Sequence, residues 1–124
     1  MITGKIKSGQ RGASQIPEDV FQTRCKVANC TLVRGTLNIH VDNLNQTLSE
    51  LGVSHFSTDI DNKIGPLEWW KIKLCNKKLG SQAIDGFIVR HKRTGTNYLE
   101  IMSTVNFRDG GVIDGDTVTI EVIK

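Results

Sequence analysis

The residue types best suited to chemistry are Thr36 and Asn38, in the stretch RGTLNIHVD at positions 34–42. Apolar and polar residues alternate there, which predicts a strand with one polar face that carries both side chains. A hydroxyl and an amide oxygen placed in this way can bind one hard cation, with phosphate and water oxygens completing its shell. Gly35 would let a phosphate approach closely. The alternative is a half-buried strand with an ordinary polar face.

A second candidate is a loop of small residues near the N-terminus. Loops of this composition can turn several backbone N–H groups toward an anion, and Arg11 could add a bidentate contact to a phosphate. The loop lacks the lysine of a Walker A motif and the spacing of a dinucleotide-binding motif, so a plain turn is the alternative. The candidate residues are Ser8, Gly9, Gln10, Arg11, Gly12 and Ala13.

The segment HKRTGTN at positions 91–97 is the densest cationic point of the chain. Lysine and hydroxyl side chains in one loop can accept a phosphate or the polar edge of a base, and a solvated hairpin loop is the alternative. For His40 and His55 we expect partly exposed strand positions. Trp69 and Trp70 alternate sides, so one belongs to the core and the other is a candidate for a ligand surface.

The bulk composition limits the function classes. The 124 residues predict one domain, residues 1–124, with a net charge of +3 that suits phosphate handling but not a dedicated nucleic-acid binder. Aromatic residues make up 6%, which disfavours a base-stacking platform. Three cysteines form no disulfide or zinc pattern and favour reduced thiols. With no signal peptide or membrane-length apolar run evident, we expect a cytoplasmic protein.

The order of elements favours a mainly β fold. The patterns predict strands at 2–7, 36–42, 67–74, 84–90, 98–105 and 117–123, a helix at 17–28 and a short helix at 43–51 closed by Gly52. Many short strands with glycine-marked turns and few helices are typical of a small closed β-barrel rather than a layered α/β sheet. Asp114 and Asp116 are expected to shape a turn.

Several stretches together resemble the archaeal CTP-dependent riboflavin kinases. The similarity begins at GKIKSG (4–9), is most specific at GTLN (35–38), and returns at IDGFIV (84–89), in the basic loop and at DGDTV (114–118). The resemblance implies a six-stranded cradle-loop barrel, related to the riboflavin synthase and flavokinase barrels. It also implies transfer of the γ-phosphoryl group of CTP to the ribityl 5′-hydroxyl of riboflavin, which gives FMN.

The resemblance also implies roles for individual residues. Thr36 and Asn38 would hold Mg²⁺, the loop from Ser8 to Ala13 would cradle the nucleotide phosphates, and Lys92 and Thr94 would lie near the nucleotide. Glu100 falls in a strand that approaches the flavin in that family. The expected cofactor is Mg²⁺, and the expected partners are CTP or another nucleotide and riboflavin or FMN, with no membrane, nucleic acid disfavoured, and a monomer or weak dimer.

The chain departs from the family pattern in the phosphate loop, where the family usually reads Gly-x-Gly-Glu-Gly-Arg and this chain lacks the glutamate. Arg34 stands where proline or an acidic residue is common. Two other functions therefore stay open: a barrel that binds a nucleotide or flavin without turnover, and a DNA-binding or transcription-linked barrel. The last would gather its lysines and arginines on one convex face.

Overall fold

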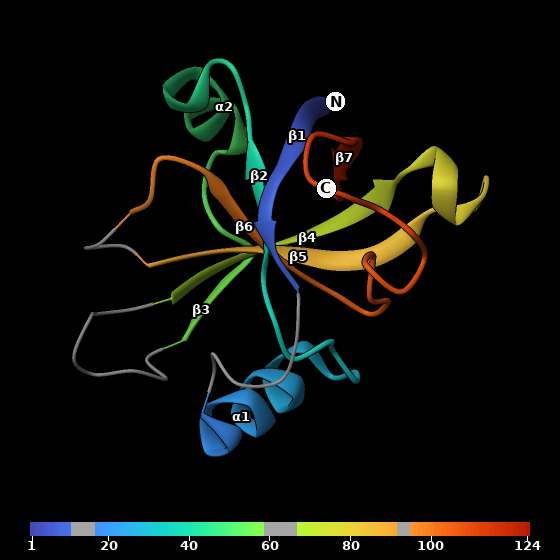
Figure 1. The fold of residues 1–124 in the computed structure, drawn as a ribbon. Coiled ribbons are helices and arrows are strands. Elements are labelled where there is room, and N and C mark those ends of the chain that lie inside the picture. The colour runs from blue at the N-terminus through green and yellow to red at the C-terminus, as the bar shows by residue number, and fades with distance from the viewer. Residues whose placement is uncertain (11–16, 59–66, 92–94) are drawn as a thin grey trace.

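The computed structural model describes residues 1–10, 17–58, 67–91 and 95–124. Strands dominate the described part of the chain, and two short helices and one 3₁₀ turn accompany them (Figure 1). The strands are β1 (Ile2–Gly9), β2 (Leu37–His40), β3 (Phe56–Thr58), β4 (Leu67–Cys75), β5 (Ile84–His91), β6 (Leu99–Ser103) and β7 (Thr117–Val122). The helices are α1 (Glu18–Ala28) and α2 (Leu44–Leu51), and the 3₁₀ turn is η1 (Lys77–Leu79).

Six of the strands close into an antiparallel barrel. Each strand pairs with the next in the order β4-β5-β6-β2-β1-β7, and β7 pairs back onto β4 from Ile72↔Val122 to Cys75↔Thr119. Strand β3 is an extra strand that pairs only with β4 among the described strands. The predicted fold class, a small closed six-stranded β-barrel with short helices, is confirmed.

Apolar side chains at every second position of the strands fill the barrel interior. Leu37 and Ile39 of β2 are fully buried, and Trp70, Ile72 and Leu74 of β4 join them in one apolar core. The intervening residues of each strand point outward, as the two-residue period requires. Trp70, Ile72 and Leu74 therefore form the face of β4 that points into the barrel.

A second apolar cluster lies outside the barrel, beneath α1. Trp69 stacks on Phe56 with ring centroids 5.4 Å apart and meets the edge of Phe87, also at 5.4 Å. Val20 and Phe21 of α1 pack against this cluster. The side chain of Trp69 is fully buried, so the expectation that the second tryptophan could line a ligand surface is wrong. The outer face of β4 is covered, and both tryptophans belong to cores.

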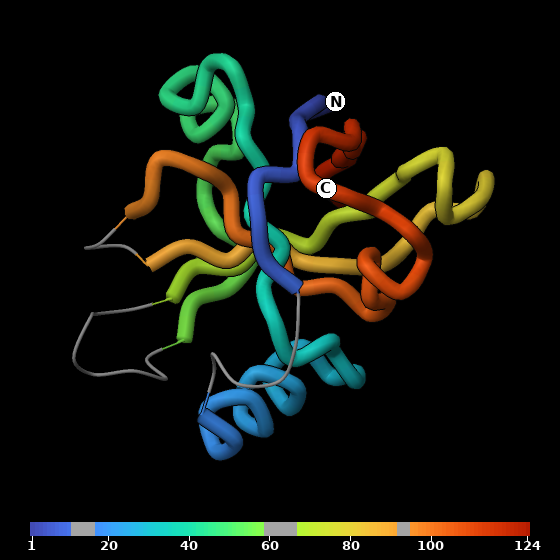
Figure 2. The backbone as a smooth tube through the Cα atoms, in the orientation of Figure 1, coloured from blue at the N-terminus to red at the C-terminus, as the bar shows by residue number. Residues whose placement is uncertain are grey.

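The two helices lie at opposite ends of the molecule (Figure 2). The predicted helix at 17–28 forms from Glu18, with Pro17 at its N-cap. A proline is tolerated there because the N–H that it lacks would have no partner within the helix. The short helix predicted at 43–51 forms from Leu44 and ends at Gly52, whose φ is +68°. Glu18 and Asp19 occupy the first turn of α1, at the positive end of the helix dipole.

The strands differ from the predictions at their ends. β1 extends to Gly9, whereas β2 and β6 are shorter than the alternation predicted. Just beyond the end of β6 the Thr104 amide donates to the Asp85 carbonyl of β5. Cys25, Cys30 and Cys75 are free thiols. Among the described residues no helix is long and apolar enough to cross a membrane.

Candidate functional site

Thr36, Asn38 and Ser8 come together on the outer face of the barrel, and we call these three residues the Asn38 site. The Asn38 side-chain amide donates through Nδ2 to Ser8 Oγ at 2.9 Å, which turns its Oδ1 toward Thr36. Thr36 Oγ1 lies 3.4 Å from Asn38 Oδ1. All three side chains are half-buried. The first two candidate stretches of the sequence therefore meet at this point.

Strand register explains this meeting. Ser8 of β1 is the partner of Asn38 in β2, and Asn38 is in turn the partner of Glu100 in β6. These three residues form one row across three neighbouring strands, on the face opposite the buried Leu37 and Ile39. The row places Glu100, the expected flavin-side residue, directly beside Asn38.

The oxygens of the Asn38 site have the chemistry and the approximate spacing that suit a hard cation. Two adjacent ligands of Mg²⁺ at about 2.0–2.1 Å lie about 2.9 Å apart in an octahedral shell. The observed separation of Thr36 Oγ1 and Asn38 Oδ1 is 3.4 Å, so a small side-chain rotation brings both within range. No cluster of three or more histidine, cysteine, aspartate or glutamate side chains suited to a metal occurs among the described residues. Two neutral protein oxygens leave the remaining positions to phosphate and water.

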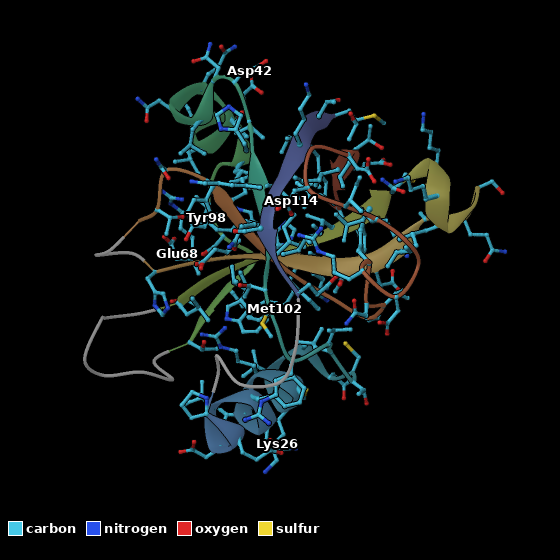
Figure 3. The ribbon with its side chains drawn as sticks, in the orientation of Figure 1. Lys26, Asp42, Glu68, Tyr98, Met102 and Asp114 are labelled. Carbon is cyan, nitrogen blue, oxygen red and sulfur yellow. The ribbon has the colours of Figure 1, made fainter. Side chains whose placement is uncertain are left out.

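Glu100 has an unusual electrostatic environment. Burial raises the pKa of its carboxyl above the ordinary value, and the positive charges of Arg24 and Arg90 offset part of this rise. Arg24 belongs to α1 and is itself buried, with Nη1 3.6 Å from Met102 Sδ. Figure 3 shows Met102 between the barrel and this helix. Glu100 is thus a carboxylate held beside the Asn38 site with a strengthened affinity for a proton.

Gly9 continues the backbone from the Asn38 site toward the predicted phosphate loop. Its φ is +100°, and a Cβ built on it would lie 2.1 Å from the Thr36 carbonyl oxygen. The next residue, Gln10, donates its backbone N–H to that same carbonyl at 2.7 Å. The start of the loop is therefore fixed against the residue that precedes β2.

The side chain of Gln10 is used by the fold. It is 1% exposed, its Nε2 donates to Ser103 Oγ at 2.6 Å, and its Oε1 accepts from the Phe107 amide at 2.7 Å. Because its backbone N–H already donates to the Thr36 carbonyl, Gln10 has no N–H group left over for the predicted phosphate contact in this arrangement. Arg11, Gly12 and Ala13 lie outside the described residues.

A cavity of about 350 Å³ opens beside the start of this loop. Arg108 borders it and also braces the loop: Nε donates to the Gly9 carbonyl at 3.1 Å and Nη2 to Asp114 Oδ1 at 2.5 Å. Its lining is more polar than that of most small-molecule sites, because four of its six residues are polar or charged. The residues that line it are Gln10, Asn106, Arg108, Asp109, Val112 and Ile113.

The ends of the basic loop are held by Arg90. Its guanidinium donates to the carbonyls of Thr96 at 2.8 Å and Tyr98 at 3.3 Å. A Cβ on Gly95 would meet this guanidinium at 2.6 Å, so glycine makes the close packing possible. Lys92 and Thr94, the predicted nucleotide contacts of the loop, lie outside the described residues. Arg90 is committed to the hairpin rather than to a convex cationic face.

The remaining predicted positions have structural roles. Asp116 pairs with Lys78 at 2.6 Å and accepts from the Ile113 amide at 3.0 Å, and these contacts lower its pKa. It shapes a turn, as expected. His55 Nδ1 accepts from the Lys71 amide at 2.8 Å, which is a backbone contact of a strand edge. His40 is exposed, with Nε2 3.7 Å from Asp42 Oδ1.

Sequence reasoning missed Lys7, Tyr98 and Arg108. Lys7 Nζ lies 4.6 Å from the centroid of the Tyr98 ring, beside the row that contains Asn38 and Glu100. No local pattern marks these residues, because the Lys7–Tyr98 contact and the bond from Arg108 to Gly9 each join positions far apart in the sequence. No model of a known protein family and no curated protein matches this chain. The site's own geometry therefore carries the functional argument.

Proposed function

We propose that this protein is a Mg²⁺-dependent kinase that transfers the γ-phosphoryl group of CTP to riboflavin, in the manner of the archaeal enzymes its sequence resembles. The observation that carries the proposal is the Asn38 site. Thr36 Oγ1 and Asn38 Oδ1 lie 3.4 Å apart, and the residue that orients Asn38 begins the predicted phosphate loop. A phosphoryl-transfer site needs the oxygens that bind the metal ion to lie close to the loop that holds the phosphates.

The nucleotide would lie between this site and the cavity bordered by Arg108. The polar groups of Asn106 and Asp109 and the apolar side chains of Val112 and Ile113 line that cavity, which suits a base or ribose. The phosphates would then extend past Gly9 toward Thr36 and Asn38. When bound, Mg²⁺ would neutralise charge on the β- and γ-phosphates.

The transfer itself needs positioning more than covalent chemistry. The oxygen of the riboflavin 5′-hydroxyl forms a bond to the γ-phosphorus as the bond to the β–γ bridging oxygen breaks. The electron pair of the broken bond stays with CDP, and the hydroxyl proton leaves to a base or to solvent. Glu100 is placed to accept it, because it lies beside Asn38 and burial raises its proton affinity.

The test is a product assay with riboflavin, Mg²⁺ and either CTP, ATP or GTP. We expect FMN from CTP, and a loss of at least about a hundredfold in rate for Asn38→Ala, because the variant removes one metal oxygen and the partner of Ser8. Asn43→Ala, an exposed asparagine at the start of α2, is the control for an asparagine substitution. FMN formation that survives Asn38→Ala would contradict the role of the site.

Absence of FMN with all three nucleotides would contradict the kinase proposal. Equilibrium dialysis with CTP, riboflavin and FMN would then separate the remaining functions. Saturable binding of a nucleotide or a flavin without turnover would indicate a non-catalytic barrel. Binding of duplex DNA that weakens steeply with salt would indicate the transcription-linked function.

A further inference from the structure

Strand β1 contains an irregularity next to the Asn38 site. Its pairing with β2 runs Lys5↔His40 and Ile6↔Ile39, and then shifts to Ser8↔Asn38, which leaves Lys7 without a partner in the ladder. Such a bulge turns consecutive side chains toward the same face instead of opposite faces. Bulges are common beside active sites, where they redirect a side chain.

The contacts of Lys7 and Ser8 show this redirection. Ser8 bonds to the outward-pointing Asn38, and Lys7 also lies on the outer face, with Nζ 4.6 Å from the centre of the Tyr98 ring. Tyr98, which is labelled in Figure 3, directly precedes β6. In the sheet, β2 lies between β6 and β1. Adjacent strands are about 4.8 Å apart, so the backbones of β1 and β6 lie about 10 Å apart, and the side chains of Lys7 and Tyr98 meet between them. The Lys7 ammonium therefore lies over β2, the strand that carries Asn38.

The other cations near this surface are held by the fold. Arg24 is buried against Met102, and Arg90 is bonded to the carbonyls of Thr96 and Tyr98. Lys7 is exposed, and within the described part of the chain no ion pair joins it to a carboxylate. Its contact with the half-buried Tyr98 ring is weak compared with a charge-assisted bond to phosphate. Of these three cations, Lys7 is therefore the one most readily moved to an incoming anion.

We propose that Lys7 binds the nucleotide phosphates and stabilises the transferred group, in place of the lysine that the predicted phosphate loop lacks. This inference rests on the proposed kinase function. On arrival of CTP, Lys7 leaves the Tyr98 ring and donates to phosphate oxygens beside the Asn38 site. It keeps its proton throughout, because its part is to neutralise the charge that accumulates as the bond to the bridging oxygen breaks.

The first test measures binding and does not require turnover. Tyr98 is the one tyrosine of the sequence, so its ring resonances in an NMR spectrum need no further assignment. We expect inorganic tripolyphosphate and CTP, each with Mg²⁺, to shift these resonances as Lys7 departs. The same additions should leave them unchanged in Lys7→Gln. Cytidine, which has no phosphate, should not displace Lys7 in the unmodified protein.

The second test compares two lysines of one strand. We expect Lys7→Gln to weaken CTP binding by roughly tenfold or more, the loss of one charge-assisted contact. Lys5→Gln removes the same charge from an exposed position two residues away and should change binding by less than about twofold. Lys7→Arg should restore most of the affinity, and the kcat for FMN formation should follow the same order.

The outcomes separate the two proposals. If CTP supports FMN formation and Lys7→Gln behaves like Lys5→Gln, the role of Lys7 is wrong and the kinase function stands. If Lys7→Gln loses tripolyphosphate binding but no nucleotide yields FMN, Lys7 is an anion contact and the kinase function is wrong. If neither tripolyphosphate nor CTP binds the unmodified protein, both proposals are wrong.

Discussion

Gly9 and Thr36 approach each other so closely that the Thr36 carbonyl occupies the space that a side chain on Gly9 would need. A Cβ at Gly9 would lie 2.1 Å from the Thr36 carbonyl oxygen, and that oxygen already accepts the N–H of Gln10. The contact joins the start of the predicted phosphate loop to the start of β2, the strand of the proposed metal site. Each half of the Asn38 site therefore depends on the position of the other.

The first prediction concerns Gly9→Ala. We expect a loss of more than about 2 kcal/mol in the free energy of unfolding, because the change combines a positive φ with a backbone clash. Gly80→Ala is a matched control: its φ is +97° against +100° at Gly9, but nothing lies within 4 Å of its Cβ position. Urea denaturation of both variants measures the difference. Equal losses in the two variants would mean that the close approach costs nothing.

The second prediction concerns Arg108, which joins Gly9 to the loop that contains Asp114. Its guanidinium donates to the carbonyls of Gly9 and Val112 and to Asp114 Oδ1. Arg108→Lys keeps the charge but cannot make this set of bonds, so we expect a loss of about 1–3 kcal/mol in stability. We also expect weaker CTP binding, since Gly9 leads into the predicted phosphate loop. An unchanged urea midpoint would exclude the bracing role.

The barrel could be predicted from the sequence because each wall strand carries its own signal. Leu37 and Ile39 alternate with Thr36 and Asn38, and the buried and half-buried positions follow this pattern. Closure depends instead on the pairing of β4 with β7, strands more than forty positions apart, which no local period encodes. The number of short strands and turns nevertheless favoured a closed barrel, because closure pairs the edge strands and leaves no edge exposed.

The site was only partly predictable for the same reason. Thr36 and Asn38 share a face by local geometry, but their contact with Ser8 depends on β1 and β2 pairing with a bulge at Lys7. Gln10 looks like a solvent-facing loop residue in the sequence. It is buried because Ser103 and Phe107, more than ninety positions away, supply bonds for its amide. A lone polar residue in a small-residue loop gives no sign of such partners.

The third prediction concerns Thr36, whose hydroxyl is one of the two proposed metal oxygens. Thr36→Val keeps the shape of the side chain and removes the oxygen, whereas Thr36→Ser keeps the oxygen. Removal of a residue that only hydrogen-bonds to a metal ligand typically lowers metal affinity about 10–100-fold, and Thr36 is proposed as a ligand itself. We therefore expect Thr36→Val to raise the Mg²⁺ concentration for half-maximal FMN formation at least tenfold, and Thr36→Ser to leave it within a few-fold. A magnesium titration of both variants decides; equal curves would remove Thr36 from the metal site.

The last prediction follows from the pKa of Glu100, which burial raises above its ordinary value despite the opposing charges of Arg24 and Arg90. A raised pKa in the folded state means that folding favours the protonated carboxyl. Its contribution to stability is complete below the unfolded pKa of about 4.3 and is lost as the pH rises through the folded pKa. The ionised carboxylate is therefore a cost at neutral pH.

Glu100→Gln removes this titration and keeps the shape of the side chain. We expect the melting temperature of the variant, relative to that of the unmodified protein, to rise as the pH increases from about 4.3 through the raised pKa. Thermal unfolding across this range measures the difference, and the exposed Glu121→Gln shows the general effect of removing one carboxylate. A difference that falls with increasing pH would mean that Arg24 and Arg90 outweigh burial. If Glu100 also accepts the hydroxyl proton, the same variant loses FMN formation while it keeps CTP binding, which separates the chemical role of this carboxylate from its effect on stability.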